Sequence, residues 1–133
     1  MVEQKPHLKG ATNMRPHEKL QTWIESVDLV LNIYKATEKF PKEERFGLTS
    51  QIRRAAVSIP ANIAEGAARN SSKEFAHFVS IAQGSASELE TELIIAYRLG
   101  YLSETLFSKL LADLERIGRM ITGLTRRLRR VPV

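Results

Sequence analysis

The chain has 133 residues, no cysteine and a formal net charge of +5 at pH 7, and 43% of its residues are hydrophobic. Its length and apolar content predict one domain with one core, and the lack of cysteine excludes disulfides, thiolate metal sites and cysteine nucleophiles. The positive charge favours polyanionic partners. Residues 1–16 have few apolar residues and no hydrophobic signal core, so we expect a disordered leader on a cytoplasmic protein without a membrane partner.

The first helical pattern covers residues 17–39. Apolar side chains recur there at spacings of four and three, at Leu20, Ile24, Val27, Leu31 and Tyr34. This period predicts an amphipathic helix whose apolar stripe faces a core. Pro41 ends it, because the residue before a proline is disfavoured in helical backbone.

The second helix is expected over residues 44–68, with a kink at Pro60, which lacks a backbone donor. Its polar side chains fall within a sector of roughly 80° on a helical wheel. They are Gln51, Arg54, Ser58, Asn62, Glu65 and Arg69. Most of the remaining surface is alanine, isoleucine or valine, so we expect this helix to lie deep in a bundle, or between a bundle and a second subunit.

Two further helices follow. Ser71 and Glu74 form a capping-box pattern that opens a helix ending at Gly100, and Ser103 caps a fourth helix with leucine and isoleucine at intervals of three and four. Gly84 and Ser85 in the third helix are expected to allow a close helix approach. Long helices with short links predict an all-α, antiparallel up-down-up-down four-helix bundle over residues 17–130, with a disordered tail at 131–133.

Basic residues gather on the fourth helix, opposite its apolar seam, within about 100° of arc. They are Lys109, Arg116, Arg119, Arg126, Arg127 and Arg130. Together with Arg129, and with Arg54 on the second helix, they are our candidate nucleic-acid ligands, because arginine matches phosphate bidentately. The alternative is a solvated helix face whose arginines offset the helix dipole.

Another group of residues is expected to make interhelix or subunit contacts. Arg53 lies on a different side of the second helix from Arg54, and Glu88 or Glu92 is the expected partner of its guanidinium group. The other members of this group are Ser58, Pro60, Asn62 and Glu65.

No catalytic site, metal site or cofactor is predicted, and we do not expect an enzyme. Glu74 and His77 match one half of a motif by which four-helix bundles hold two metal ions, but the sequence lacks the other half. Glu88, Glu90 and Glu92 alternate by two, which scatters them over different faces of a helix.

The segments FGLTSQIRRAAVSIPANIAEGAARNSSKEF and FVSIAQGSASELETELIIAYRLGYL, preceded by KLQTWIESVDLVLNIYKATEKFP, resemble the four-helix-bundle proteins encoded in intervening sequences of bacterial 23S ribosomal RNA genes, the S23 family. The resemblance covers about residues 17–124. That family is similar in fold to the accessory variability proteins of diversity-generating retroelements, which form homopentamers and bind nucleic acid and a reverse transcriptase. The resemblance therefore implies a homo-oligomer, expected to be a pentamer, and a non-enzymatic role.

These patterns support two hypotheses. The first is a homo-oligomeric bundle that binds RNA or DNA through phosphate contacts with low sequence specificity, because the fourth helix offers few side chains that read base edges. The second is a protein-interaction scaffold or accessory subunit, whose basic face docks an acidic partner such as a reverse transcriptase.

Overall fold

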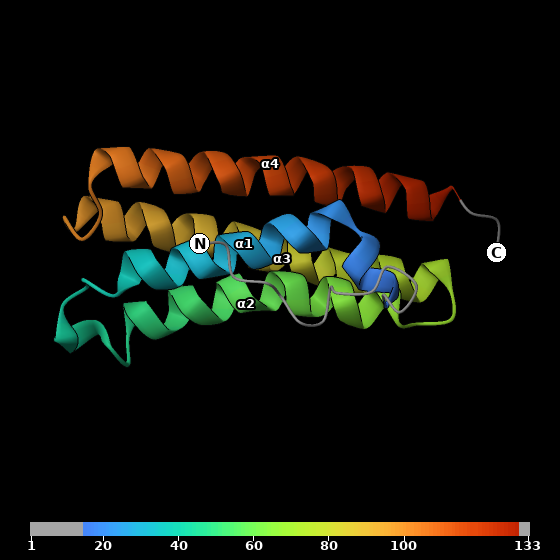
Figure 1. Cartoon of the computed structure of the whole chain (residues 1–133), viewed down its shortest axis with the longest axis horizontal. Coiled ribbons are helices and arrows are strands. Elements are labelled where there is room, and N and C mark those ends of the chain that lie inside the picture. Colours follow the sequence, from blue (N-terminus) through green and yellow to red (C-terminus); the bar gives the residue numbers. More distant parts are fainter. Residues whose placement is uncertain (1–14, 131–133) are drawn as a thin grey trace, which may run out of the picture.

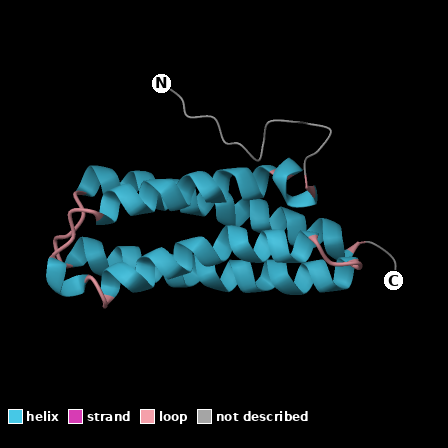
Figure 2. Ribbon diagram, turned by 60° about the horizontal axis from the view of Figure 1, so that its bottom comes forward, coloured by secondary structure: helices cyan, strands magenta, loops and turns pink. Residues whose placement is uncertain are grey.

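Four long helices make up most of the described chain, residues 15–130 of this computed structural model (Figure 1, Figure 2). They are α1 (Gln21–Thr37), α2 (Leu48–Ala67), α3 (Ser72–Arg98) and α4 (Glu104–Arg129), with short 3-10 helices η3 (Pro16–Lys19) and η4 (Lys42–Glu44). Each long helix packs against the next, and α4 also packs against α1. The predicted all-α four-helix bundle is confirmed. The tail at 131–133 and residues 1–14 of the predicted leader lie outside the described residues.

The first helix is shorter than predicted. Leu20 has extended backbone, with φ −85° and ψ 124°, and it separates η3 from α1. The side chain of Glu18 stabilises η3 by accepting a hydrogen bond from the Arg15 backbone N–H at 2.9 Å. The predicted helix over 17–39 is therefore a 3-10 turn followed by an α-helix that ends at Thr37.

The buried side of α1 also differs from the predicted one. Leu31 and Tyr34 are 50% and 41% exposed, whereas Ser26 and Thr37 are buried. Ser26 Oγ donates to the Trp23 carbonyl at 3.0 Å and Thr37 Oγ1 donates to the Ile33 carbonyl at 2.8 Å, so their hydroxyl groups enter the core with partners. Because small hydroxyl residues bonded to their own helix are buried cheaply, α1 turns this side inward and leaves Leu31 and Tyr34 outside.

The start of α2 is held by a carboxylate. The side chain of Glu44, at the end of η4, accepts the Leu48 backbone N–H at 3.2 Å, and its other oxygen accepts the Tyr101 hydroxyl at 2.9 Å. Gly47 breaks the helical path between η4 and α2, so the expected helix over 44–68 begins at Leu48 instead. The α-helix then continues through Pro60, which is buried.

The close approach between α2 and α3 occurs at Gly66 rather than at Gly84. A Cβ atom at Gly66 would lie 2.8 Å from Phe75 Cδ1 and 2.9 Å from Phe78 Cβ, whereas one at Gly84 would have nothing within 4 Å. The expectation for Gly84 was therefore wrong. The most extensive helix contact in the bundle is the one between α2 and α3.

The ends of α3 and α4 follow the predicted capping signals. Ser71 Oγ accepts the Glu74 N–H and Ser103 Oγ accepts the Leu106 N–H, both at 3.1 Å. Gly100 has φ +84°, a left-handed conformation that suits glycine at a helix end.

One core runs along the bundle between the four helices. The side chains that are at most 1% exposed include Leu29, Ile33, Ile52, Ile59, Ile63, Leu89, Leu93, Leu110, Ile117 and Ile121. All four helices contribute to this set, which explains why the bundle forms one unit. Within the described residues, no helix is long and apolar enough to cross a membrane.

Candidate nucleic-acid interface

The amino-terminal half of α4 uses its cations in ion pairs. Lys109 Nζ lies 3.3 Å from Asp113 Oδ2 on the same helix. Arg116 reaches α1, where its Nε and Nη2 donate to the two carboxylate oxygens of Glu25 at 2.7 and 3.1 Å. This two-pronged hydrogen bond raises the pKa of Arg116 and lowers that of Glu25. Arg116 therefore joins α4 to α1, whereas the ion pair of Lys109 stays within α4.

The carboxyl-terminal part of α4 carries a different set of cations. Arg126, Arg127, Arg129 and Arg130 are all exposed, and within residues 15–130 none of their side chains forms a hydrogen bond or an ion pair. We call these residues the arginine cluster. Figure 1 shows the end of α4 (red) at the same end of the bundle as η3 (blue) and the turn between α2 and α3 (green).

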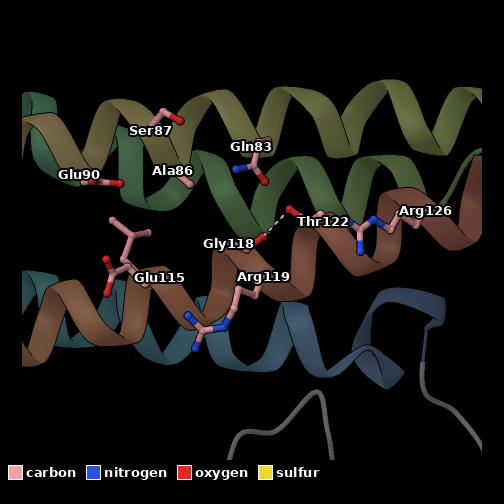
Figure 3. A pocket seen from close by; sticks show the side chains of 10 residues that line it. Gln83, Ala86, Ser87, Glu90, Glu115, Gly118, Arg119, Thr122 and Arg126 are labelled. Atoms are coloured by element: carbon pink, nitrogen blue, oxygen red, sulfur yellow. Dashed lines mark hydrogen bonds between the residues drawn. The ribbon is translucent and has the colours of Figure 1, made fainter.

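A groove lies between α3 and α4 and has a volume of about 630 Å³. Arg119 and Arg126 line it from α4, on either side of Thr122, and Gln83 lines it from α3 (Figure 3). The far end of the groove is acidic, because Glu90 lies there opposite Glu115 (Figure 3). The remaining lining residues are Ala86, Ser87, Leu114 and Gly118.

Reasoning from sequence assigned Arg119 and Arg126 to the interface but missed the α3 side of this groove. Gln83, Ser87 and Glu90 recur at spacings of four and three, which places them on one face of α3. That spacing was the available signal. The sequence does not show that this face of α3 lies beside the side of α4 that carries Arg119.

Arg54 is exposed, as a phosphate ligand requires. It lies on α2, however, which packs mainly against α1 and α3 rather than against α4. It lines a second groove, between α2 and α3, with a volume of about 500 Å³. Glu88 lines the same groove together with Gln51, Ala55 and Ser58. The predicted ligand Arg54 and the arginine cluster thus belong to different surfaces.

Hydroxyl and amide groups connect α2 to α3 beside this second groove. Ser58 Oγ and Ser85 Oγ are 2.7 Å apart, and Asn62 Nδ2 donates to Ser58 Oγ at 2.9 Å and to the Ser58 carbonyl at 2.8 Å. Ser58 and Asn62 therefore take part in an interhelix contact within one chain.

Arg53 joins α2 to α1. Its Nε donates to Thr37 Oγ1 at 2.8 Å and its Nη2 donates to the Tyr34 carbonyl at 3.3 Å. The guanidinium carbon lies 4.5 Å from the centre of the Tyr34 ring, a cation–π distance. The expected partners, Glu88 and Glu92, were wrong, because both are on α3, on the other side of α2.

The remaining predicted contact residues fall in three environments. Pro60 is buried in α2, and Glu65 is exposed and pairs with Arg69 at 2.6 Å. Glu92 is 6% exposed, and its Oε1 has no hydrogen-bond partner among the described residues. Burial, and then the charge of Glu88, raise the pKa of Glu92 to about 7.

No group of three or more candidate ligands in the described part of the chain is arranged to hold a metal ion. The ring of His77, half of the motif considered above, lies edge-on to Phe78 with ring centres 5.4 Å apart. The two residues are neighbours on α3, so this histidine contacts an aromatic ring.

The fold defines this chain as an all-α four-helix protein with an arginine-rich last helix. It belongs to the family of 23S rRNA-intervening sequence proteins, whose family model matches residues 18–123. A crystal structure of a protein of unknown function from the S23 ribosomal protein family of Bacteroides thetaiotaomicron is similar, with a TM-score of 0.74 and 24% identity. The alignment covers 79% of this chain and 95% of that one, and at this identity it shows the shared fold alone. Among curated proteins, no relative matches.

Proposed function

We propose that this protein is a non-enzymatic, homo-oligomeric four-helix bundle that binds RNA or DNA through phosphate contacts in the cytoplasm. The observation that carries the proposal is the arginine cluster, whose side chains are exposed and have no carboxylate partner within residues 15–130. No acidic residue follows Glu115 in the sequence, so nothing on α4 beyond that point neutralises the cluster. Unpaired arginines attract phosphates because they release condensed counterions from nucleic acid.

The dimensions of α4 suit a run of phosphates. Arg119 and Arg130 are separated by about 17 Å along the helix, at about 1.5 Å per residue. Phosphates on one strand of a duplex are spaced about 3.4 Å apart along its axis, so this length spans about five of them. Helix α4 has no asparagine or glutamine, the side chains that read adenine edges, so we expect little sequence preference.

Exposed apolar side chains support self-association. Leu31, Tyr34 and Val57 lie on the outside of α1 and α2, Ile95 lies on α3 and Leu99 directly follows it, each between 41% and 54% exposed. Exposed apolar surface on a helical bundle commonly marks a protein contact. The pentamer that the S23 resemblance implies is part of this proposal.

The proposal is tested by removing the arginine cluster. In the variant Arg126→Ala/Arg127→Ala/Arg129→Ala/Arg130→Ala, we expect binding of a labelled mixed-sequence RNA at low salt to weaken by about tenfold or more. The slope of log affinity against log salt should fall in magnitude by about 3, since each of the four lost phosphate contacts lowers it by roughly 0.7 on a single strand. Fluorescence anisotropy at several salt concentrations measures both quantities.

A matched control removes the same charge at the other end of the bundle. The variant Lys39→Ala/Lys42→Ala/Arg45→Ala/Arg98→Ala also loses four exposed cations, and it should keep the wild-type salt slope. Equal loss in both variants would mean that binding follows net charge alone. An RNA affinity that neither variant changes would favour the rival function, an accessory subunit that docks an acidic protein such as a reverse transcriptase.

A further inference from the structure

The groove between α3 and α4 has opposite charges at its two ends. Arg126 lines one end, Glu90 and Glu115 line the other, and Arg119 lies between them (Figure 3). Glu115 and Arg119 are one helical turn apart, yet within residues 15–130 no ion pair joins them. Their charges therefore remain available to a ligand.

We propose that a single nucleic-acid backbone lies in the arginine end of this groove, and that Glu90 and Glu115 form a stop that excludes the next phosphate. This inference rests on the proposed function. It states where on the bundle the strand binds and where the bound segment ends. The backbone runs from the arginine cluster at the bundle end toward Thr122 and ends before Glu115. The acidic pair thus sets the register of the strand on α4.

The groove offers phosphate ligands on both of its walls. Arg119 and Arg126 are seven residues apart, so they project from one side of α4 at a separation of about 10 Å. Thr122 lies between them, and the amide of Gln83 supplies a donor from α3 (Figure 3). Arginine and amide N–H groups are both donors to phosphate oxygens.

The size and lining of the groove favour one strand over a duplex. Packed helices have axes about 8–10 Å apart, so the space above their contact admits one backbone but not a double helix. None of the residues that line the groove is aromatic, so it offers bases no stacking platform. The groove can therefore hold a backbone while the bases point outward.

The acidic end opposes a phosphate placed there. At a separation of about 8 Å in water, the repulsion between two like charges lowers affinity by a factor of about 2. A phosphate placed between Glu90 and Glu115 is repelled by both carboxylates. Its binding is therefore weakened more than by either carboxylate alone.

The test removes the stop without changing side-chain shape. In Glu90→Gln, we expect the affinity for a labelled ten-nucleotide single-stranded RNA at low salt to rise about twofold. In Glu90→Gln/Glu115→Gln, we expect a rise of about fourfold or more and a steeper salt slope, because a further phosphate gains access to the groove.

The control for this test lies two residues away on the same helix. Glu88 is exposed and lines the α2–α3 groove with Arg54, so Glu88→Gln changes net charge by the same amount on another surface. We expect its RNA affinity to stay at the wild-type value. Equal gains for Glu88→Gln and Glu90→Gln, or a gain for Glu88→Gln alone, would overturn the inference.

The two proposals fail in different ways. If the wild-type protein binds no RNA at low salt, the proposed function is wrong, and the stop has no ligand to act on. If the wild type binds and loses affinity with the arginine cluster, but Glu90→Gln/Glu115→Gln binds as the wild type does, only the inference about the groove is wrong. Light scattering of the double variant gives a further check, because a change in particle mass would mean that the groove is a subunit interface.

Discussion

Glu92 is a carboxyl group that the bundle buries without giving its Oε1 a hydrogen-bond partner among the described residues. Its pKa is raised from the ordinary value of 4.5 to about 7, first by burial and then by the nearby Glu88. In the unfolded chain this group ionises near its ordinary pKa, whereas in the folded chain it keeps its proton up to about pH 7. The folded state therefore binds more protons, and its stability falls as pH rises from about 4.5 to 7.

Replacing Glu92 by glutamine should remove this pH dependence. We expect Glu92→Gln to match the wild type in free energy of unfolding near pH 4 and to exceed it by up to about 3 kcal/mol at pH 8. Urea denaturation at pH 4, 6 and 8 measures the difference. Glu90→Gln, at an exposed position on the same helix, is the control and should run parallel to the wild type. A Glu92→Gln curve that stays parallel as well would show that Glu92 ionises freely in the folded protein.

Arg53 shows that the side of a helix on which a residue lies is easier to predict than its hydrogen-bond partners. The sequence places it on a different side of α2 from Arg54, and in the structure Arg53 contacts α1 whereas Arg54 is exposed. Its partners could not be predicted, because the choice between Thr37 and the glutamates of α3 depends on which helix lies on which side of α2.

At the scale of the helices, Gly66 controls how closely α2 and α3 approach. Because a Cβ atom there would clash with Phe75 and Phe78, we expect Gly66→Ala to lower the free energy of unfolding by about 1–3 kcal/mol. Gly84→Ala is the matched control on α3, where a Cβ atom meets nothing within 4 Å. It should raise stability by up to about 1 kcal/mol, since alanine favours a helix over glycine.

Thermal or urea denaturation of both glycine variants decides this prediction. If Gly66→Ala were as stable as Gly84→Ala, the two phenylalanines would have moved aside, and α2 and α3 would not need glycine at their contact. The opposite order of stability would place the close approach at Gly84, as the sequence suggested.

The ends of the helices divide into predictable and unpredictable ones. Ser71, Gly100 and Ser103 act locally, so their capping roles followed from sequence alone. The start of α2 did not, because Glu44 contacts Tyr101, a residue 57 positions away in the chain. The buried side of α1 was also predicted wrongly, because the most apolar stripe of this helix is not its most buried one.

At the scale of the whole molecule, the stripe that α1 leaves exposed is the main reason to expect an oligomer. Leu31 and Tyr34 face outward together with Val57 on α2. We expect light scattering after size exclusion to give the mass of several subunits, and Leu31→Glu/Val57→Glu to lower it. High salt should not dissociate the particle, because apolar contacts are not screened by ions.

The control for this experiment is Phe46, which is 89% exposed in the segment between η4 and α2. Phe46→Ser also removes a large apolar side chain from the surface, and we expect it to leave the mass unchanged. A monomeric wild-type protein would contradict the homo-oligomer directly. A loss of mass in Phe46→Ser but not in Leu31→Glu/Val57→Glu would place the contact at that segment.

The sequence by itself determined the number and order of the helices, the caps of α3 and α4, and the arginine-rich end of α4, because helical period and capping act over a few residues. Only the tertiary structure decided which side of α1 is buried and that Arg116 pairs with Glu25 on α1. It also brought Glu90 to the far end of the Arg119 groove. Each of these depends on the rotation of one helix against another, which is fixed by packing between residues distant in the chain.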